Sequence, residues 1–355
     1  MKTILVMSGK GGVGKTTVSV NLANYLLEKN LKIGLLDADM TGPNVLKMLG
    51  RDEIKFSMDG DEIIPFKIND SFKVASVAGF IEEGKAVIWR GSLKHKALQQ
   101  LSKSKEWDEQ DYLIVDFPPG TSDEHISAAQ ILRNVVGAVI VSTPQNVAIQ
   151  DLLRSINFCQ HLKIPIIGLI ENMSSELFGK ETVRQVALQN KLNFLGTIPL
   201  RKLLVTTSEE GKRLQDFKDE ELNNIFQEIT SNLLKRIEEI ENETREMSDE
   251  IAQKNISKNI LVPVTENNRQ AKISKHFGHS KYFAIYDPDN KEFTFFENRL
   301  QHDNINESAV SQAIKLFRPK KVFVVNMGAK AKEEFKLMNV EVEFVKEQNL
   351  EDLFE

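Results

Sequence analysis

A glycine-rich segment near the N-terminus constrains the fold of this chain more than any other feature. Residues 9–17 read Gly-Lys-Gly-Gly-Val-Gly-Lys-Thr-Thr and follow the apolar run from Ile4 to Met7. The pattern G-x-x-x-x-G-K-T between a strand and a helix is typical of a phosphate-binding loop. Its glycines let the backbone curl N–H groups around an anion, which side chains would hinder. We therefore expect a strand, a triphosphate-binding loop and a helix, in that order.

Individual residues of this loop have distinct expected roles. The free N–H groups and positive dipole end of the following helix favour a triphosphate. Lys15 is expected to reach the β- and γ-phosphates, and the Thr16 hydroxyl to ligate Mg²⁺. The alternative is a glycine-rich turn that binds no ligand. The expected nucleotide-binding residues are Gly9, Lys10, Gly11, Gly12, Val13, Gly14, Lys15, Thr16 and Thr17.

Short apolar runs alternate with helical patterns between residues 1 and 240. This alternation predicts an α/β fold, a mostly parallel sheet covered by helices on both faces. The apolar runs span residues 3–7, 32–37, 112–116, 135–142 and 165–170, and helices are expected over 16–29, 92–101, 123–132 and 147–162.

The character of the sequence changes after a last helical pattern from Asp219 to about Glu241. Residues 242–258 are polar, carry both signs of charge and show little periodicity, so we interpret them as a linker or a frayed helix end. We expect domains over residues 1–241 and 259–355, the second a smaller α/β domain. Its expected strands are 260–264, 282–286, 293–296, 321–325 and 340–345, and its helices are 305–317 and 329–338.

Composition excludes several classes of protein. The net charge is −5 and 41% of residues are hydrophobic, so we expect ordinary packed cores and no nucleic-acid binding through overall charge. We find no signal peptide and no apolar run near the ~18 residues that span a bilayer, which predicts a cytoplasmic protein without stable membrane insertion. The single cysteine, Cys159, excludes an intrachain disulfide and any Cys-x-x-Cys metal site.

Acidic residues follow two of the expected strands, where open parallel sheets gather ligands. Asp116 ends the run from Tyr112 and is expected to hold Mg²⁺ through water; the alternative is a helix cap. Asp37 and Asp39 follow the second strand, close to the expected γ-phosphate. One can order the attacking water while the other supports the metal, unless both are ordinary turn residues.

Lys10 needs its own explanation, because a phosphate-binding loop does not require lysine directly after its first glycine. A second lysine so near the phosphates could cross a dimer interface and neutralise charge in the transition state. The alternative is a solvated surface lysine, and chemistry alone favours neither.

Several motifs resemble those of known families. The loop resembles the deviant Walker A motif of the MinD/ParA class of ATPases, and further segments resemble the Mrp family of iron-sulfur cluster carrier ATPases. These segments are residues 37–44, 87–91, 107–121 and 171–174. The resemblance implies an ATP-sandwiched homodimer in which Lys10 acts across the interface. It further implies that Lys10, Lys15 and Asp39 are catalytic, that Asp37 is a switch residue, and that Asn172 and Pro199 border the adenine.

The chain departs from that family where a cluster would be bound. Family members usually carry a Cys-Pro-x-Cys pair after Glu-Asn-Met-Ser, and two subunits share one [4Fe-4S] cluster. Residues 174–180 read Ser-Ser-Glu-Leu-Phe-Gly-Lys instead. Thiolates are the normal ligands of such clusters, so the bridging cluster cannot form in the family's way. Cys159 lies in an apolar helical pattern and is expected to be a buried core thiol.

The second domain resembles the dinitrogenase iron-molybdenum cofactor biosynthesis group, on residues 273–283, Ile-Ser-Lys-His-Phe-Gly-His-Ser-Lys-Tyr-Phe. The group holds metal-sulfur clusters without a cysteine cage, and the fusion resembles the orange-protein fusions of the Mrp family. His276 and His279 could bind a metal or cluster from their glycine-containing turn, with His302 as a third ligand. Alternatively, His276 is a structural turn residue and His279 is simply exposed.

These observations lead to a functional hypothesis with two alternatives. We expect a homodimeric, Mg²⁺-dependent ATPase whose nucleotide state controls delivery of an iron-sulfur or molybdenum-containing cluster to client apoproteins. The first alternative is a MinD/ParA-like positioning or scaffold ATPase without cluster cargo. In the second, only the C-terminal domain binds the cluster and the N-terminal domain senses nucleotide.

Overall fold

The computed structural model describes the chain except residues 40–41, 55, 60–61, 77–90, 122, 178–181, 254–259, 299, 301–307 and 355. Residues 40–41 and 87–90 of the quoted motifs and His302 therefore lie outside the described residues. The chain divides into two compact units, Met1–Ile240 and Glu241–Glu355. Each unit has its own sheet, and each is described by itself below.

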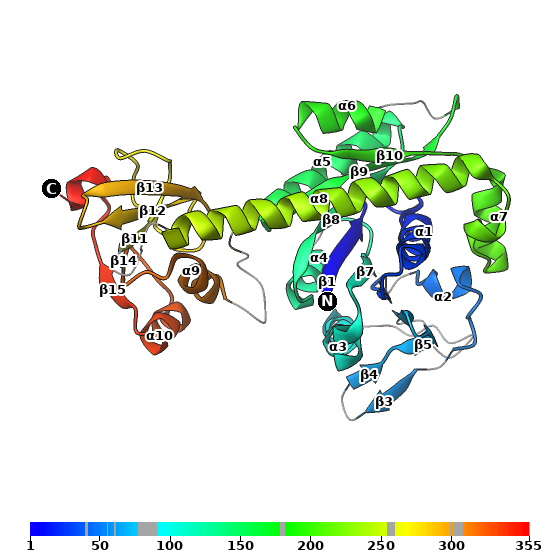
Figure 1. Ribbon diagram of the computed structural model, residues 1–355, viewed down its shortest axis with the longest axis horizontal. Coiled ribbons are helices and arrows are strands. Elements are labelled where there is room, and N and C mark those ends of the chain that lie inside the picture. Colours follow the sequence, from blue (N-terminus) through cyan, green and yellow to red (C-terminus); the bar gives the residue numbers. More distant parts are fainter. Residues whose placement is uncertain are drawn as a thin grey trace. The chain divides into compact units, whose positions relative to one another are not determined.

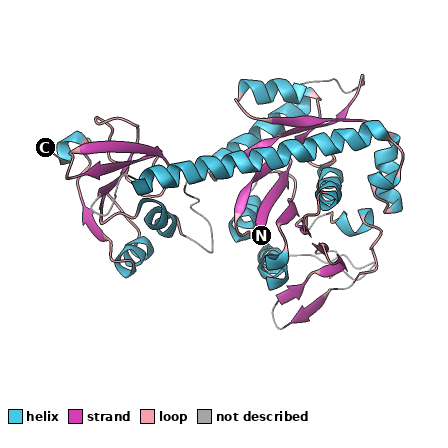
Figure 2. Ribbon diagram, viewed as in Figure 1, coloured by secondary structure: helices cyan, strands magenta, loops and turns pink. Residues whose placement is uncertain are grey.

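An eight-stranded sheet forms the centre of the first unit (Figures 1 and 2). Its order is β10-β9-β8-β1-β7-β2-β6-β5, and neighbours are parallel except β5 and β6. The expected parallel sheet is thereby confirmed, although β5, β6 and β10 were not expected. The strands are β1 (Lys2–Met7), β2 (Ile33–Asp37), β5 (Phe66–Asn69), β6 (Phe72–Ser76), β7 (Tyr112–Asp116), β8 (Val135–Ser142), β9 (Ile166–Ser174) and β10 (Phe194–Pro199). A separate hairpin joins β3 (Ser57–Asp59) to β4 (Glu62–Ile64).

Helices cover both faces of this sheet, as the alternating pattern predicted. Leu22 of α1 and Phe226 of α8 belong to the core on one face, and Leu101 of α3 and Ile156 of α5 to the core on the other. The helices are α1 (Lys15–Glu28), α2 (Val45–Met48), α3 (Gly91–Lys103), α4 (Asp123–Ile131), α5 (Asn146–His161), α6 (Thr182–Gln189), α7 (Lys202–Glu210) and α8 (Glu220–Gln253), with 3₁₀ turns η2 (Lys105–Glu109) and η3 (Leu214–Asp216).

Strand register brings the expected site residues to one edge of the sheet. Asp116 of β7 pairs with Val6 of β1 on one side and with Asp37 of β2 on the other. Because these strands are parallel, the loop that follows β1 starts at the same edge as both aspartates. The fold therefore juxtaposes the phosphate-binding loop with two carboxylates.

The helix α8 is longer than the sequence pattern indicated. It runs Glu220–Gln253, so the boundary between the units falls inside it and the expected linker 242–258 is helical as far as Gln253. Its apolar stripe ends near Ile240, which led us to end the helix there. The residues beyond contain no glycine or proline and several good helix formers, which explains why the helix continues.

The second unit is a five-stranded sheet of order β13-β12-β11-β14-β15. The strands β11, β12 and β13 are antiparallel neighbours, whereas β11, β14 and β15 are parallel. Apolar residues of α9 and α10 belong to the core on one face, and Leu350 to a smaller core on the other. The elements are β11 (Ile260–Val264), β12 (Tyr282–Asp287), β13 (Glu292–Glu297), α9 (Ala309–Phe317), β14 (Lys321–Val324), α10 (Ala329–Leu337), β15 (Glu341–Phe344) and η4 (Glu351–Leu353).

Packing of α8 on the first unit generates a stability prediction. The Phe226 ring stacks on Tyr25 of α1 with centroids 5.5 Å apart, and Phe226 is fully buried. Phe226→Ala is expected to cost about 3–5 kcal/mol because it leaves a cavity. That loss lowers the melting temperature of a domain of this size by about 6–20 °C in calorimetry. Leu188→Ala on α6, where the side chain is 73% exposed, is the control and should shift it little.

Candidate functional site

The glycine-rich loop curls between β1 and α1, and a neighbouring strand supports it. Gly12 and Gly14 have φ angles of 80° and 82°, in the left-handed region that side chains disfavour. Asn172 of β9 donates from Nδ2 to the Val13 carbonyl oxygen at 2.8 Å. A Cβ atom on Gly14 would lie 2.1 Å from that Nδ2 atom, so the contact itself requires glycine.

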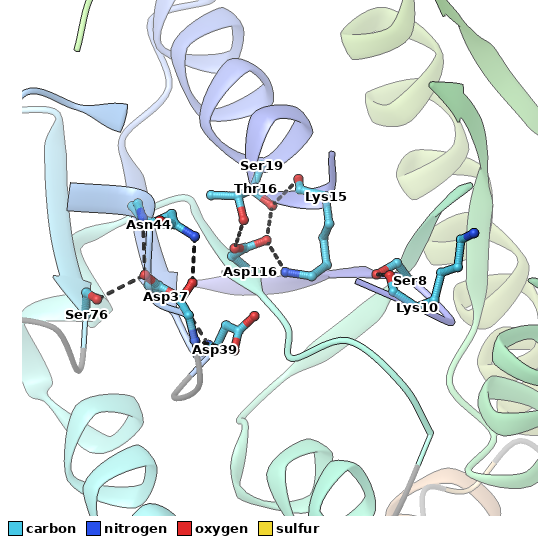
Figure 3. Close-up of polar contacts among 12 residues, drawn as sticks. Ser8, Lys10, Lys15, Thr16, Ser19, Asp37, Asp39, Asn44, Ser76 and Asp116 are labelled. Atoms are coloured by element: carbon cyan, nitrogen blue, oxygen red, sulfur yellow. Dashed lines mark hydrogen bonds and ion pairs between the residues drawn. The ribbon is translucent and has the colours of Figure 1, made fainter. Parts of the chain in front are cut away.

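Three residues of α1 converge on the carboxylate of Asp116 (Figure 3). Lys15 Nζ lies 2.8 Å from Oδ1, and the Thr16 hydroxyl donates to Oδ2 at 2.7 Å. The Ser19 hydroxyl also contacts Oδ1 at 2.8 Å. The sequence analysis named Lys15, Thr16 and Asp116 but missed Ser19, which lies one helical turn after Lys15 and so shares its face.

Asp37 is fully buried beside this cluster. Its Oδ1 accepts from the Asp39 N–H at 3.2 Å, and its Oδ2 accepts from the Val45 N–H at 3.2 Å and the Ser76 hydroxyl at 3.0 Å. Burial, together with the nearby Asp116 carboxylate, raises the pKa of Asp37 to about 7. The hydrogen bonds from Val45 and Ser76 and the charge of Lys15 oppose the shift but do not cancel it. The surroundings of Asp37 therefore disfavour its ionised form.

A cleft of about 340 Å³ opens over the loop. Asp39 lines it together with the loop residues Lys10, Lys15 and Thr16, whereas Pro199, at the end of β10, is not among its lining residues. Several lining residues were not among the expected site residues, including Lys47 of α2 and Ser208 and Glu209 of α7. They reach the cleft through tertiary packing of α2 and α7, for which the sequence carries no local signal.

Lys10 differs from Lys15 in its orientation. The Lys10 carbonyl oxygen accepts from the Ser8 hydroxyl at 3.0 Å, which shapes the first turn of the loop. Its side chain extends away from Lys15 and Asp116 (Figure 3). The lysine therefore lies on the cleft but does not join the carboxylate cluster of its own subunit.

The second unit contains a separate cavity of about 370 Å³. His276 and His279 line it, and their rings are 6.3 Å apart and nearly perpendicular. The N-cap residues of α9 and α10, Ser308 and Gly328, line it as well, and Ser308 donates a hydrogen bond to Glu334. Within the described residues, no group of three or more His, Cys, Asp or Glu side chains is arranged to hold a metal ion.

Cys159 is a core thiol, as its helical context predicted. The residue is fully buried on α5, and its Sγ lies 3.8 Å from Met7 Sδ. Burial raises the pKa of the thiol to about 12. A thiol that stays protonated and inaccessible is not available as a cluster ligand.

The parallel sheet, the loop and the carboxylates at the strand ends define a P-loop NTPase. The match to a family model confirms this class: residues 1–234 match the ParA model described as the NUBPL iron-transfer P-loop NTPase. The chain belongs to that family. Residues 258–355 match a second model, described as dinitrogenase iron-molybdenum cofactor.

Curated relatives and solved structures agree with this assignment. The cytosolic Fe-S cluster assembly factor NUBP2 homolog of Dictyostelium discoideum is 41% identical over 59% of this chain and 84% of its own length. The assembly factor CFD1 of Yarrowia lipolytica is 36% identical over 70% of this chain and 90% of its own length. An ADP complex of the nucleotide-binding protein from Archaeoglobus fulgidus superposes with a TM-score of 0.52 at 30% identity, covering 61% of this chain and 89% of that one.

A further structural likeness concerns the fold alone. The cell division ATPase MinD of Pyrococcus furiosus superposes with a TM-score of 0.52 at 22% identity, covering 66% of this chain and 98% of that one.

Of the described helices, none combines the length and apolar character that crossing a membrane requires.

The raised pKa of Asp37 generates a prediction about pH and stability. In the unfolded chain the ordinary pKa is 3.8, so the folded state binds the proton more tightly and loses stability as pH rises from about 4 to about 7. Asp37→Asn removes that loss. We would measure the free energy of unfolding in urea, without nucleotide and with EDTA. The value for Asp37→Asn relative to the wild type should rise over this pH range and level off above it.

The exposed residue Asp52 provides the matched control. Asp52→Asn should change the free energy of unfolding by less than about 0.5 kcal/mol at every pH, because substitutions of exposed surface residues usually have effects no larger than this. Between pH 4 and pH 8 the free energy of unfolding of Asp37→Asn, taken relative to the wild type, should rise by about 1 kcal/mol or more. An Asp37→Asn effect that does not change with pH would contradict the assignment of a buried, proton-binding carboxyl.

Proposed function

We propose that this protein is a Mg²⁺-dependent ATPase that works as an ATP-sandwiched homodimer. The observation that carries the proposal is the convergence of Lys15, Thr16 and Ser19 on Asp116 beneath an open cleft. Lys15 and Thr16 are the loop residues whose polar groups suit phosphate and metal. In the proposed cycle both residues release Asp116 when ATP binds. Lys15 then contacts the β- and γ-phosphates, and Thr16 contacts the metal.

The residues around Asp116 fit a Mg²⁺ ion. Mg²⁺ prefers oxygen ligands and usually keeps several of its waters. The Thr16 hydroxyl and the carboxylates of Asp37 and Asp116 supply oxygen atoms at this place, and a cation there would favour the ionised form of the buried Asp37 carboxyl. When bound, the ion would neutralise charge on the phosphates. Thr16 would bind it directly, Asp116 would hold it through water and Asp37 would support it.

Asp39 and Lys10 are the proposed residues for the hydrolysis step. Asp39 lines the cleft next to the loop, where its carboxylate can orient an attacking water towards the γ-phosphate. Lys10 lies on the same cleft with its side chain directed away from its own Asp116 (Figure 3). That direction suits a lysine that stabilises the transition state in a partner subunit.

This proposal predicts that Lys10 acts in trans. Lys10→Ala should leave ATP-analogue affinity within about threefold but lower kcat at least about a hundredfold, because transition-state charge is lost. Mixing Lys10→Ala with Lys15→Ala should restore part of the activity, since the heterodimer contains one site that has Lys15 from its own subunit and Lys10 from the partner. Hydrolysis is measured as Mg²⁺-stimulated phosphate release.

One control and three possible results decide how this experiment is interpreted. Lys29→Ala removes an exposed lysine at the end of α1, outside the cleft, and should leave hydrolysis unchanged. Inactive mixtures would contradict the trans role, and full activity of Lys10→Ala would contradict any catalytic role. A wild-type protein without Mg²⁺-stimulated hydrolysis would overturn the ATPase proposal itself.

We further propose that the protein carries a metal-sulfur cluster for client apoproteins in the cytosol. Support comes from the iron-transfer family of the first unit and from relatives named as cytosolic Fe-S cluster assembly factors. In this chain the cargo site is His276 and His279 in the second unit, because Cys159 is buried and no Cys-Pro-x-Cys pair exists. Imidazole nitrogen suits iron and other transition metals.

This second proposal predicts metal binding that depends on the histidine pair. After anaerobic reconstitution with iron and sulfide, and separately with molybdate, the full chain should retain metal in elemental analysis. The double variant His276→Ala/His279→Ala should lose most of it. His161→Ala, which removes an exposed histidine of α5, should retain it fully.

Two other results of this metal-binding experiment would contradict the proposal. Equal metal in the double variant and the wild type would reject the histidine site. No metal in any variant would favour a positioning or scaffold ATPase, the alternative that the missing cysteine pair supports.

A further inference from the structure

A buried histidine supports the loop that follows Asp116. His125 lies in the first turns of α4 and is only 7% exposed. Its Nε2 is 2.8 Å from the Pro119 carbonyl oxygen, and its ring centroid is 5.9 Å from that of the fully buried Phe117. A Cβ atom on Gly120 would lie 3.3 Å from His125 Cε1. The imidazole therefore packs directly against the Pro119–Gly120 peptide.

The other side of this peptide contacts the phosphate-binding loop. The Gly120 N–H donates to the Ser8 carbonyl oxygen at 3.0 Å, and the Ser8 hydroxyl donates to the Lys10 carbonyl oxygen at 3.0 Å. Pro119 and Ser8 both line the nucleotide cleft, whereas His125 is not among its lining residues. A series of hydrogen bonds thus leads from α4 to the first turn of the loop.

Rotation of one peptide group would break this series. Gly120 has a φ angle of 107°, which lies in the region that favours glycine, so the backbone here has more freedom than at an ordinary residue. If the Pro119–Gly120 peptide turned over, its carbonyl oxygen would leave His125 and its N–H would leave Ser8. The His125 contact opposes this rotation, because turning the peptide over would remove the hydrogen bond between His125 Nε2 and the Pro119 carbonyl oxygen.

We propose that His125 is a positioning residue for ATP hydrolysis. It fixes the orientation of the Pro119–Gly120 peptide. It thereby places the loop that follows Asp116 against Ser8 and Lys10. It acts through the backbone and does not contact nucleotide. The inference rests on the proposed ATPase function and deepens it by adding a residue that governs the hydrolysis step rather than nucleotide affinity.

If His125 has a purely structural role, substitutions at this position should have different effects. If His125 only fills space against Phe117, any apolar side chain of similar size would serve, and loss of stability would be the main effect. If the bond to Pro119 matters, a side chain that keeps a donor should restore function although its shape differs. His125→Gln keeps a donor, whereas His125→Leu and His125→Phe remove it, and the phenylalanine preserves a ring against Phe117.

The test combines kinetics with hydrogen exchange on the full chain. His125→Leu and His125→Phe should lower kcat about tenfold or more while the KM for ATP changes less than about threefold, since transition-state placement is lost rather than binding. His125→Gln should stay within about threefold of the wild-type kcat. In a peptide covering residues 117–121, amide hydrogen exchange should be faster in His125→Leu and His125→Phe than in the wild type. Because Pro118 and Pro119 carry no amide hydrogen, few amides contribute to this signal and Gly120 is one of them.

A matched control separates positioning from general destabilisation. Asn232 of α8 donates from Nδ2 to the Leu195 carbonyl oxygen at 3.0 Å, the same kind of bond on a different part of the unit. Asn232→Leu should lower the melting temperature without changing kcat or the exchange of residues 117–121. An equal fall of kcat in Asn232→Leu, or in His125→Gln, would overturn the proposal.

The exchange readout keeps this inference separate from the ATPase proposal. If the wild-type chain hydrolyses no ATP, the ATPase proposal fails, and His125 as a positioning residue for it fails too. Faster exchange in His125→Leu and His125→Phe would then still support the role of His125 in fixing the Pro119–Gly120 peptide. If exchange at residues 117–121 is the same in wild type and donorless variants, the hold on the peptide is overturned, whatever the ATPase result. If His125→Leu does not fold, His125→Phe and His125→Gln decide the matter by the same comparison.

Discussion

Two buried carboxylates at the ends of adjacent parallel strands organise the nucleotide site. Asp37 and Asp116 are register partners on β2 and β7, and both are fully buried. Like charges held together in a low-dielectric interior disfavour ionisation of both. Lys15 pairs with Asp116, and burial together with the neighbouring Asp116 carboxylate raises the pKa of Asp37 to about 7. The strand register thus places two buried carboxylates side by side where the phosphate-binding loop begins.

The same carboxylates connect the surrounding elements to the sheet. Asp116 holds α1 through Thr16 and Ser19, and Asp37 holds the start of α2 through the Val45 N–H. The end of α2 in turn touches the end of α7, where a Cβ atom on Gly211 would lie 2.3 Å from the Gly50 Cα. A continuous series of contacts therefore leads from Asp37 to α7, which precedes α8.

Local sequence patterns predicted what depends on local physics. The loop, the strands before Asp37 and Asp116 and the class of fold follow from spacing and periodicity, and all are present. The strand β6 was missed because Lys73 interrupts it, and that lysine is buried only because Glu106 and Glu109 of η2 pair with it. Ser19 and His125 were missed for the same kind of reason. Their partners are Asp116 and the Pro119 carbonyl oxygen, and only the folded chain reveals these contacts.

The donor atoms of the two units suit different metals. The nucleotide cleft offers oxygen atoms, which suit a hard cation such as Mg²⁺, and the buried thiol of Cys159 adds nothing softer. The cavity of the second unit offers the imidazoles of His276 and His279, which suit transition metals. Hydrolysis and cargo binding, as proposed, thus lie in separate units, and the chain passes from one to the other through α8. Phe226 of α8 packs on Tyr25 of α1 within the first unit, and α8 continues past the unit boundary to Gln253, so one helix belongs in part to each unit.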